Sequence, residues 1–161
     1  MTGEQAETGA HGRFGYVSAY DPERHMARIR FADKDNLVSD WLPVAIPNTK
    51  KNKDEFPLDV DEHVFCMFLG NGLETGIVLS SIFDNKNKPL VKDQDIRVTT
   101  FEDETQFSYD RKKHFWKIHF MDGTEITYDC VKHLLSYDVV GDIHIKAKGR
   151  IVMEAARIDL N

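Results

Sequence analysis

Histidine is the side chain best suited to binding metals or moving protons near neutral pH, and the 161-residue sequence has seven of them. His114 and His119 are five residues apart, so on a strand they would lie on opposite faces and could not share a metal ion. His144 stands between Ile143 and Ile145, so we expect its side chain on the polar face. The histidines therefore predict no metal site and no bound cofactor, because metal sites need convergent ligands.

Thiols and carboxylates indicate little more chemistry. Cys66 and Cys130 are too few for a disulfide framework or a structural zinc site. His133 follows Cys130 by three residues, which allows a thiol–imidazole pair, although two inert thiols are the simpler interpretation. The acidic run at 102–104 is typical of a loop. No nucleophile elbow, phosphate-binding glycine loop or zinc spacing occurs, so we expect no enzyme activity and no catalytic residue.

The charge balance disfavours a nucleic-acid-binding protein. Lys and Arg number 21 against 27 Asp and Glu, a net charge of −6. Binding to a phosphate backbone depends on a basic surface. The longest apolar run, 64–69, is too short to span a bilayer, and residues 1–7 lack the basic and apolar regions of a signal peptide.

The first half of the chain has the pattern of short β-strands. Strand-forming residues flank an Asp-Pro turn at 21–22, and a later apolar segment is interrupted by two prolines, as in an edge strand. Two continuous apolar runs follow, which we interpret as strands covered on both faces, as in a small closed barrel. About five strands without a helical period favour a barrel of the oligonucleotide/oligosaccharide-binding (OB) type. The expected strands are 15–20, 26–31, 41–47, 64–69 and 77–83.

The second half alternates apolar with polar residues as far as the C-terminus, around an Asp-Gly turn at 122–123 and around Gly141 and Gly149, eight residues apart. Strands with one apolar face, in a segment of about 60 residues, have nothing in their own chain to cover that face. We therefore expect this part of the chain to self-associate. The residues expected in the shared core are Trp116, Ile118, Phe120, Ile143, Ile145, Ile151, Met153, Ile158 and Leu160.

Residues 14–90 resemble the bacteriophage baseplate assembly protein V family, the central spike of contractile tails. The resemblance covers four stretches, and the similarity of the remaining chain to the family's needle is one of pattern. The four stretches are Gly15-Tyr16-Val17-Ser18 with Asp21-Pro22-Glu23, Asp35-Asn36-Leu37-Val38-Ser39-Asp40-Trp41-Leu42-Pro43-Val44, the segment from Val64 to Gly76, and the segment from Val78 to Asp84.

The resemblance implies an all-β chain with an N-terminal OB-fold barrel and a C-terminal intertwined trimeric β-helix or β-prism. It also implies a homotrimer that plugs the centre of the baseplate, contacts the hub and tail tube proteins, and punctures the target cell envelope. The protein would be assembled in the host cytoplasm and released within the tail. The expected segments are a disordered tail at 1–12, an OB-fold domain at 13–84, a linker at 85–96 and a trimeric needle at 97–161.

Two departures from the family concern the tip and the middle of the chain. Some family members end in a His-x-His pair that holds iron, whereas this chain ends Ile158-Asp159-Leu160-Asn161. The tip is therefore either free of metal or capped by a small separate protein. A lysozyme domain, present in larger relatives, does not fit within 161 residues.

A single-stranded nucleic-acid-binding OB module is the alternative function. Aromatic residues that stack on bases would support it. Against it stand the net charge and the acidic stretch 31–62, in which four Lys face eight Asp and Glu. We therefore expect no nucleic-acid binding.

Overall fold

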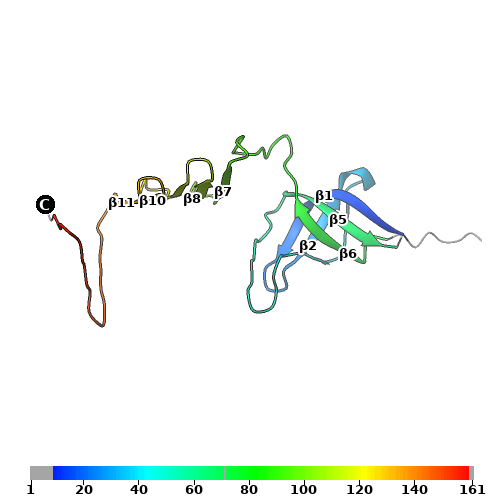
Figure 1. The fold of residues 1–161 in the computed structure, drawn as a ribbon. Coiled ribbons are helices and arrows are strands. Elements are labelled where there is room, and N and C mark those ends of the chain that lie inside the picture. Colours follow the sequence, from blue (N-terminus) through cyan, green and yellow to red (C-terminus); the bar gives the residue numbers. More distant parts are fainter. Residues whose placement is uncertain (1–8, 71, 160–161) are drawn as a thin grey trace, which may run out of the picture. The chain divides into compact units, whose positions relative to one another are not determined.

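The computed structural model describes residues 9–70 and 72–159, and within these ranges the protein is all-β apart from one short 3-10 helix, η1 (Ala32–Lys34). The chain divides between Pro89 and Leu90 into two compact units. Each unit contains one antiparallel sheet (Figure 1). The division falls inside the stretch 85–96 that the sequence predicts as a linker.

The first unit is a six-stranded sheet with the order β3-β2-β1-β5-β6, and β4 also pairs with β2. The hairpin expected around the Asp-Pro turn is confirmed, because β1 pairs antiparallel with β2. The two apolar runs also form a hairpin, in which β5 pairs antiparallel with β6. The expected edge strand at 41–47 is reduced to the two residues of β4, since its prolines lack the N–H group that a ladder needs. The strands are β1 (Ala10–Asp21), β2 (Met26–Phe31), β3 (Leu37–Val38), β4 (Leu42–Pro43), β5 (His63–Leu69) and β6 (Gly76–Ser81).

The hydrophobic core of the first unit comes from alternate positions of its strands. In β5 the buried residues are Val64, Cys66 and Phe68, spaced by two as the pleat requires. The rings of Phe31 and Phe68 meet edge to face, with centroids 5.7 Å apart. The core residues are Val17, Ala27, Ile29, Phe31, Leu42, Val64, Cys66, Phe68 and Val78.

The interpretation that both faces of β5 and β6 are covered is wrong. Met67, Leu69 and Leu79 are exposed, and Leu69 keeps 64% of its surface accessible. The side chains of each apolar run therefore alternate between a buried face and an exposed face of the sheet. Among the described residues no continuous ladder closes this sheet into a barrel, and only an isolated parallel bridge joins Val44 to Val78.

The predicted disordered tail at 1–12 is wrong for residues 10–12, while residues 1–8 lie outside the described ranges. Ala10, His11 and Gly12 are the first residues of β1, opposite Leu69, Phe68 and Met67 of β5. The prediction considered only the small apolar content of this segment. Pairing with the backbone of β5 stabilises it instead.

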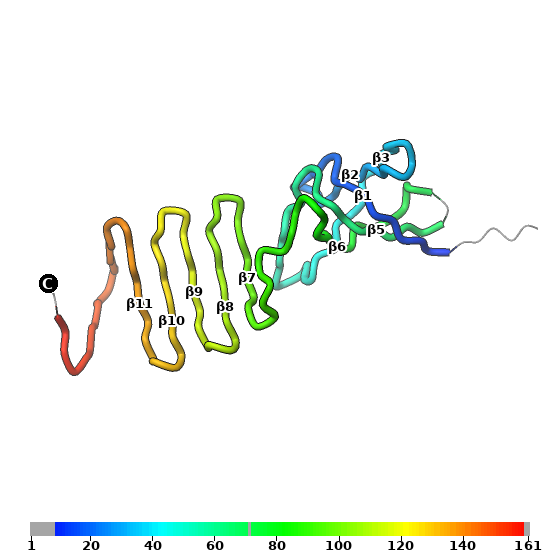
Figure 2. Tube along the Cα trace, turned by 90° about the horizontal axis from the view of Figure 1, so that it is seen from above, coloured from blue at the N-terminus to red at the C-terminus, as the bar shows by residue number. Residues whose placement is uncertain are grey.

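The second unit is an antiparallel meander with the order β11-β10-β9-β8-β7 (Figure 2). The predicted turn at 122–123 joins β9 to β10. Each strand follows its neighbour in the sequence, so every connection is a short loop. The strands are β7 (Ile96–Thr100), β8 (Gln106–Asp110), β9 (Phe115–His119), β10 (Glu125–Asp129) and β11 (Leu134–Asp138).

The alternating pattern predicted to continue as strands to the C-terminus does not form strands in the single chain. Residues 139–159 contain no strand, and Leu160 lies outside the described ranges. A strand requires a neighbour to satisfy its backbone N–H and C=O groups. Within residues 9–70 and 72–159, no strand pairs with the segment 139–159.

Candidate functional site: an uncovered aromatic sheet face

One face of the second sheet carries two cross-strand rows of aromatic and aliphatic side chains. The strand register places Trp116 opposite Tyr109 on one side and Tyr128 on the other. Because side chains alternate between faces, the neighbouring row on this face lies two residues further along each strand. The rows are Tyr109–Trp116–Tyr128–Leu135 and Phe107–Ile118–Ile126–Tyr137. We call these eight residues the aromatic face.

The opposite face of the same sheet is more polar at its centre. Ser108, Lys117, Thr127 and Ser136 form one row across it. Lys117 makes an ion pair with Glu125, whose Oε1 also lies 3.1 Å from His119 Nδ1. The hydrogen bond from Lys117, followed by that from His119, holds the pKa of Glu125 below its ordinary value. These contacts join β9 to β10 and require no ligand.

The aromatic face is not covered by any other described part of the second unit. Trp116 retains 37% of its surface and Tyr137 retains 61%. Among residues 90–159 the only buried side chain is that of Thr105, so this unit has no hydrophobic core. A sheet needs a second layer against its apolar face for stability. The exposed apolar surface that results is the main candidate binding surface of the second unit.

The structure brings together only some of the residues predicted for the shared core. Trp116 and Ile118 are two residues apart on β9, so both lie on the aromatic face. Phe120 is half-buried in the loop that follows β9. The remaining described residues are exposed in the segment without strands; these are Ile143, Ile145, Ile151, Met153 and Ile158. Sequence reasoning missed the six partners on β8, β10 and β11. Their signal was the same alternation, at 106–110, 125–129 and 134–138.

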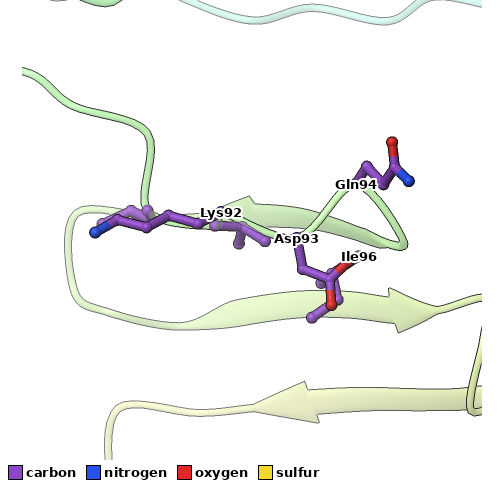
Figure 3. Close-up of a pocket in the computed structure, with 6 residues that line it drawn as sticks. Lys92, Asp93, Gln94 and Ile96 are labelled. Carbon is purple, nitrogen blue, oxygen red and sulfur yellow. The ribbon is translucent and has the colours of Figure 1, made fainter.

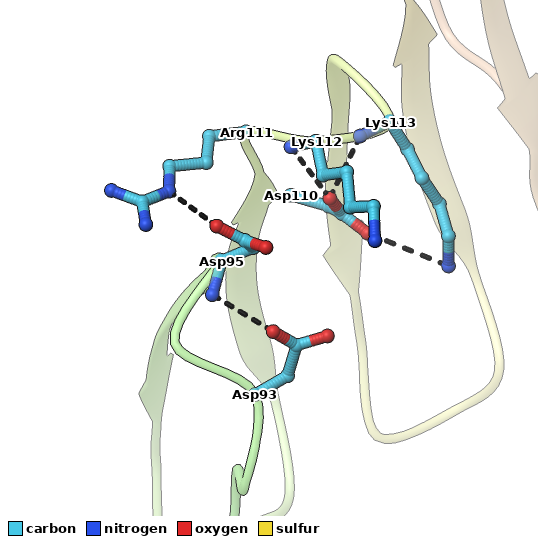
Figure 4. A network of polar contacts seen from close by, with 6 residues as sticks. All are labelled: Asp93, Asp95, Asp110, Arg111, Lys112 and Lys113. Carbon is cyan, nitrogen blue, oxygen red and sulfur yellow. Dashed lines mark hydrogen bonds and ion pairs between the residues drawn. The ribbon is translucent and has the colours of Figure 1, made fainter.

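A carboxylate organises the loop between β8 and β9. Asp110 Oδ1 accepts hydrogen bonds from the backbone N–H groups of Lys112 and Lys113, at 3.0 and 2.9 Å (Figure 4). The Lys113 ammonium nitrogen lies 3.4 Å from Oδ2. These contacts, led by the backbone hydrogen bond of Lys113, hold the pKa of Asp110 below its ordinary value. Next to this loop, Arg111 Nε donates to Asp95 Oδ1 at 2.6 Å.

The same loop occurs three times in the chain, each time with the sequence Tyr-Asp, two variable residues, a Lys or Arg, and His. Asp129 accepts from the N–H groups of Val131 and Lys132, and Asp21 accepts from those of Glu23 and Arg24. The histidine ends each loop in the left-handed backbone region, with φ of 53°, 52° and 53° at His25, His114 and His133. Three of the seven histidines are thus turn residues. The repeated Tyr-Asp…His pattern was the overlooked signal.

The loops at the other end of the strands repeat as well. Phe101-x-Asp103-x-Thr105 recurs 19 residues later, from Phe120 to Thr124. In each loop the Asp accepts from the backbone N–H of the Thr, at 3.0 Å in the first loop and 2.8 Å in the second. The repeat of this sheet is a complete hairpin of 19 residues, whereas the eight-residue spacing of Gly141 and Gly149 falls in the segment after the sheet.

One strip on the sheet of the first unit is rich in aromatic side chains. Phe14 lies opposite Phe65 and Tyr16 lies opposite His63 in the β1–β5 register. The ring centroids are 5.1 and 4.9 Å apart, respectively. The guanidinium of Arg30 lies over Tyr16, 5.6 Å from its centroid. We call these five residues the β1–β5 strip.

Reactive chemistry is sparse in the described ranges. No group of three His, Cys, Asp or Glu there is placed to hold a metal ion. Cys66 is buried, and desolvation raises the pKa of its thiol to about 12. Cys130 is half-buried, and no hydrogen bond joins its thiol to His133 in the part of the chain that the structure describes.

A shallow depression at the start of the second unit has no convergent functional groups. It is lined by residues 90–94 and by Ile96, and Figure 3 shows Lys92, Asp93 and Gln94 extending in different directions. Asp93 Oδ1 accepts from the backbone N–H of Asp95 at 2.9 Å, as in a simple turn. This depression therefore offers no pair of titratable groups that face each other.

No protein-family model matches the chain, and no curated protein sequence matches it. No helix within residues 9–70 and 72–159 has the length and apolar character needed to cross a membrane. Function must therefore be argued from the uncovered aromatic face and from the unpaired C-terminal segment.

Proposed function

We propose that this protein is the central spike of a contractile tail baseplate, a homotrimer that plugs the tail tube and punctures the target envelope. The observation that carries the proposal is the aromatic face, which has no covering layer in its own chain. Three copies that turn this face toward a common axis would bury it. The family resemblance of residues 14–90 supplies the number three and the role in the tail.

The strand order of the first unit supports an OB-type barrel. Five strands follow one another as β4-β2-β1-β5-β6, and the two ends of this path meet at the Val44–Val78 bridge. There the Ala45 N–H donates to the Val78 carbonyl at 2.8 Å. A barrel of this type is five-stranded and partly open, which accommodates so short a contact.

The C-terminal segment supports an intertwined needle. Ile143 and Ile145 alternate with His144 and Lys146, and Ile151 and Met153 lie two residues apart, yet none of the four belongs to a strand in the described chain. Neighbouring chains of a trimer would supply the missing backbone partners and cover the isoleucines. A closed prism of three chains also leaves no sheet edge within one chain exposed to unintended pairing.

A spike acts mechanically, so the proposal requires rigidity rather than catalysis. A dry apolar interior between three sheets would give a narrow, stiff rod that contraction drives into the envelope. The proposed partners are the hub and tube proteins behind it, and a small separate tip protein in front. No cofactor and no enzymatic step enter this role.

The mass in solution tests the trimer directly. Light scattering coupled to size exclusion should give about three times 18.5 kDa. A fragment that ends at Asp95 should remain folded and lose much of its association, because the core residues all lie before that point. A well-folded monomeric full chain would contradict the proposal. The role itself is tested by immunogold labelling, which should mark the baseplate end of tail particles from the cells that encode the chain.

Single-stranded nucleic-acid binding is the second candidate, and the β1–β5 strip is the observation that favours it. Exposed aromatic rings beside an arginine are the usual platform for stacked bases. However, Arg30 Nη2 lies 3.4 Å from Asp61 Oδ1, and this ion pair partly neutralises the charge that would attract a phosphate. Fluorescence anisotropy with a labelled thymidine oligonucleotide should show no binding at low salt. Salt-sensitive binding that Phe14→Ala abolishes would favour this second function instead.

A further inference from the structure

We infer that the two loop edges of the second sheet are complementary docking edges, so that the acidic edge of one copy contacts the basic edge of the next. The inference rests on the proposed self-association. It names the residues that would meet between copies and the relative orientation of those copies. The occupant of each edge is a second copy of this chain.

The acidic edge consists of the loops 101–105 and 120–124, at one end of the strands. These loops contain no Lys, Arg or His. Their charged side chains are exposed and make no ion pair within the described chain; they are Glu102, Asp103, Glu104 and Asp122.

The basic edge consists of the loops 111–114 and 130–133, at the other end of the strands. Asp110 and Asp129 start these loops, but their carboxylates turn inward and are only 13% and 18% exposed. Lys113 and Lys132 extend outward and are 77% and 75% exposed. Arg111 is 64% exposed but pairs with Asp95 at 2.6 Å. The positive charge presented to a neighbour is therefore carried by Lys112, Lys113 and Lys132.

The acidic edge and the basic edge of one chain are too far apart to form ion pairs with each other. A five-residue strand such as β8 separates them by about 17 Å. Since a meander alternates its loops between the two ends, the loops 101–105 and 120–124 lie at one end of the sheet and the loops 111–114 and 130–133 at the other. Asp95 also lies at the second end, where it pairs with Arg111. Each edge therefore needs its opposite from another molecule.

The charge pattern selects one arrangement of copies. If copies are related by rotation about an axis along the direction in which the strands stack, every junction joins an acidic edge to a basic edge. If two copies instead run in opposite directions with their aromatic faces together, acidic edge meets acidic edge. Like charges at close range cost free energy and disfavour the wrong partner. Burial of the aromatic face would drive association, and the edges would set its direction.

Charge reversal on one edge, and then on both, tests this inference. The acidic-edge variant carries Glu102→Lys and Glu104→Lys, and the basic-edge variant carries Lys112→Glu and Lys113→Glu. The combined variant carries all four changes and keeps the net charge of the original chain. Light scattering over a dilution series measures the protein concentration at which half of each variant is associated. The same series in urea extends the measurement to assemblies that do not dissociate on dilution alone.

We expect each single-edge variant to need about tenfold or more protein to associate at low salt, because every junction then joins like charges. The combined variant should associate as the original chain does, since each junction is again complementary. In about 1 M salt the differences should shrink, because the screening length falls to about 3 Å. Unchanged association of both single-edge variants, or a combined variant as weak as either, would overturn the inference and leave the proposed trimer intact. A monomeric original chain would overturn both.

Carbodiimide, which joins a carboxylate to an amine without a spacer, gives an independent readout. Crosslinked peptides should join the loop 101–105 to the loop 111–114 and should be confined to the associated species. The separation of the edges within one chain excludes such a link inside a monomer. Crosslinked oligomers that lack any link between an acidic-edge and a basic-edge loop would contradict the inference.

Discussion

Lys113 contacts the carboxylate of Asp110 twice, through its backbone N–H at 2.9 Å from Oδ1 and through its ammonium nitrogen at 3.4 Å from Oδ2. Lys132 and Asp129 repeat both contacts 19 residues later. The carboxylate thus accepts hydrogen bonds from loop N–H groups that would otherwise bind water. These hydrogen bonds stabilise one conformation of the hairpin loop.

Asp110→Ala should lower the melting temperature of the protein, because two loop N–H groups lose their acceptor. Asp110→Asn should lower it less, since the amide oxygen still accepts both hydrogen bonds. Lys113→Gln should have the smallest effect, because an exposed ion pair contributes little. Thermal melts followed by circular dichroism measure all three. Equal melting temperatures for the Ala and Asn variants would show that the carboxylate does not organise the loop.

The protein should lose stability as the pH falls below about 4. In the folded state, hydrogen bonds lower the pKa of Asp110, mainly from the Lys113 N–H, and that of Asp129, mainly from the Lys132 N–H. The Arg24 side chain lowers the pKa of Asp21 in the same way. A lowered folded pKa adds stability above the unfolded value, 3.8, and that stability disappears as the pH falls through the folded pKa. Urea midpoints that stay constant from neutral pH to pH about 3 would contradict this expectation.

Phe68→Ala should destabilise the first unit by about 3–5 kcal/mol, since it leaves a cavity beside Phe31 in a fully buried core. Phe14→Ala is the matched control, because Phe14 is 57% exposed on the outer face of the same sheet. Its cost should be about 1 kcal/mol or less. Urea unfolding measures both, and similar losses in the two variants would mean that the core is misplaced.

Cys66 should not react with a thiol reagent in the folded protein. It is buried, and its pKa of about 12 leaves almost no thiolate at neutral pH. In a Cys130→Ser variant, labelling of the remaining thiol should begin only when urea unfolds the first unit. Rapid labelling of that variant without denaturant would contradict the assigned core.

Ile145→Asp should weaken the trimer, whereas His144→Asp should change little. Under the proposed function Ile145 faces the shared interior, where three copies of a carboxylate would be desolvated and close together. The cost is at least several kcal/mol by the usual magnitudes. Melting in detergent compares the two variants. A larger loss at His144 would mean that the faces of the needle are reversed.

Local chemistry made several features predictable from the sequence alone. The Asp21-Pro22 and Asp122-Gly123 turns were recognisable because a turn depends on the few residues that form it. Alternation placed Trp116 and Ile118 on one face, because the pleat gives neighbouring residues opposite directions. The same local rules contain the 19-residue repeat, because its Tyr-Asp…His and Phe-x-Asp-x-Thr loops are short sequence patterns.

The tertiary structure decided what depends on distant partners. Ala10 to Gly12 form a strand because β5 offers them a backbone, and Leu69 stays exposed because no second layer covers its side of the sheet. Residues 139–159 have the alternation of strands but pair with no strand in the described part of the chain. A strand exists only where another strand completes its hydrogen bonds, and a sequence pattern records the tendency of a segment without identifying the neighbour that satisfies it.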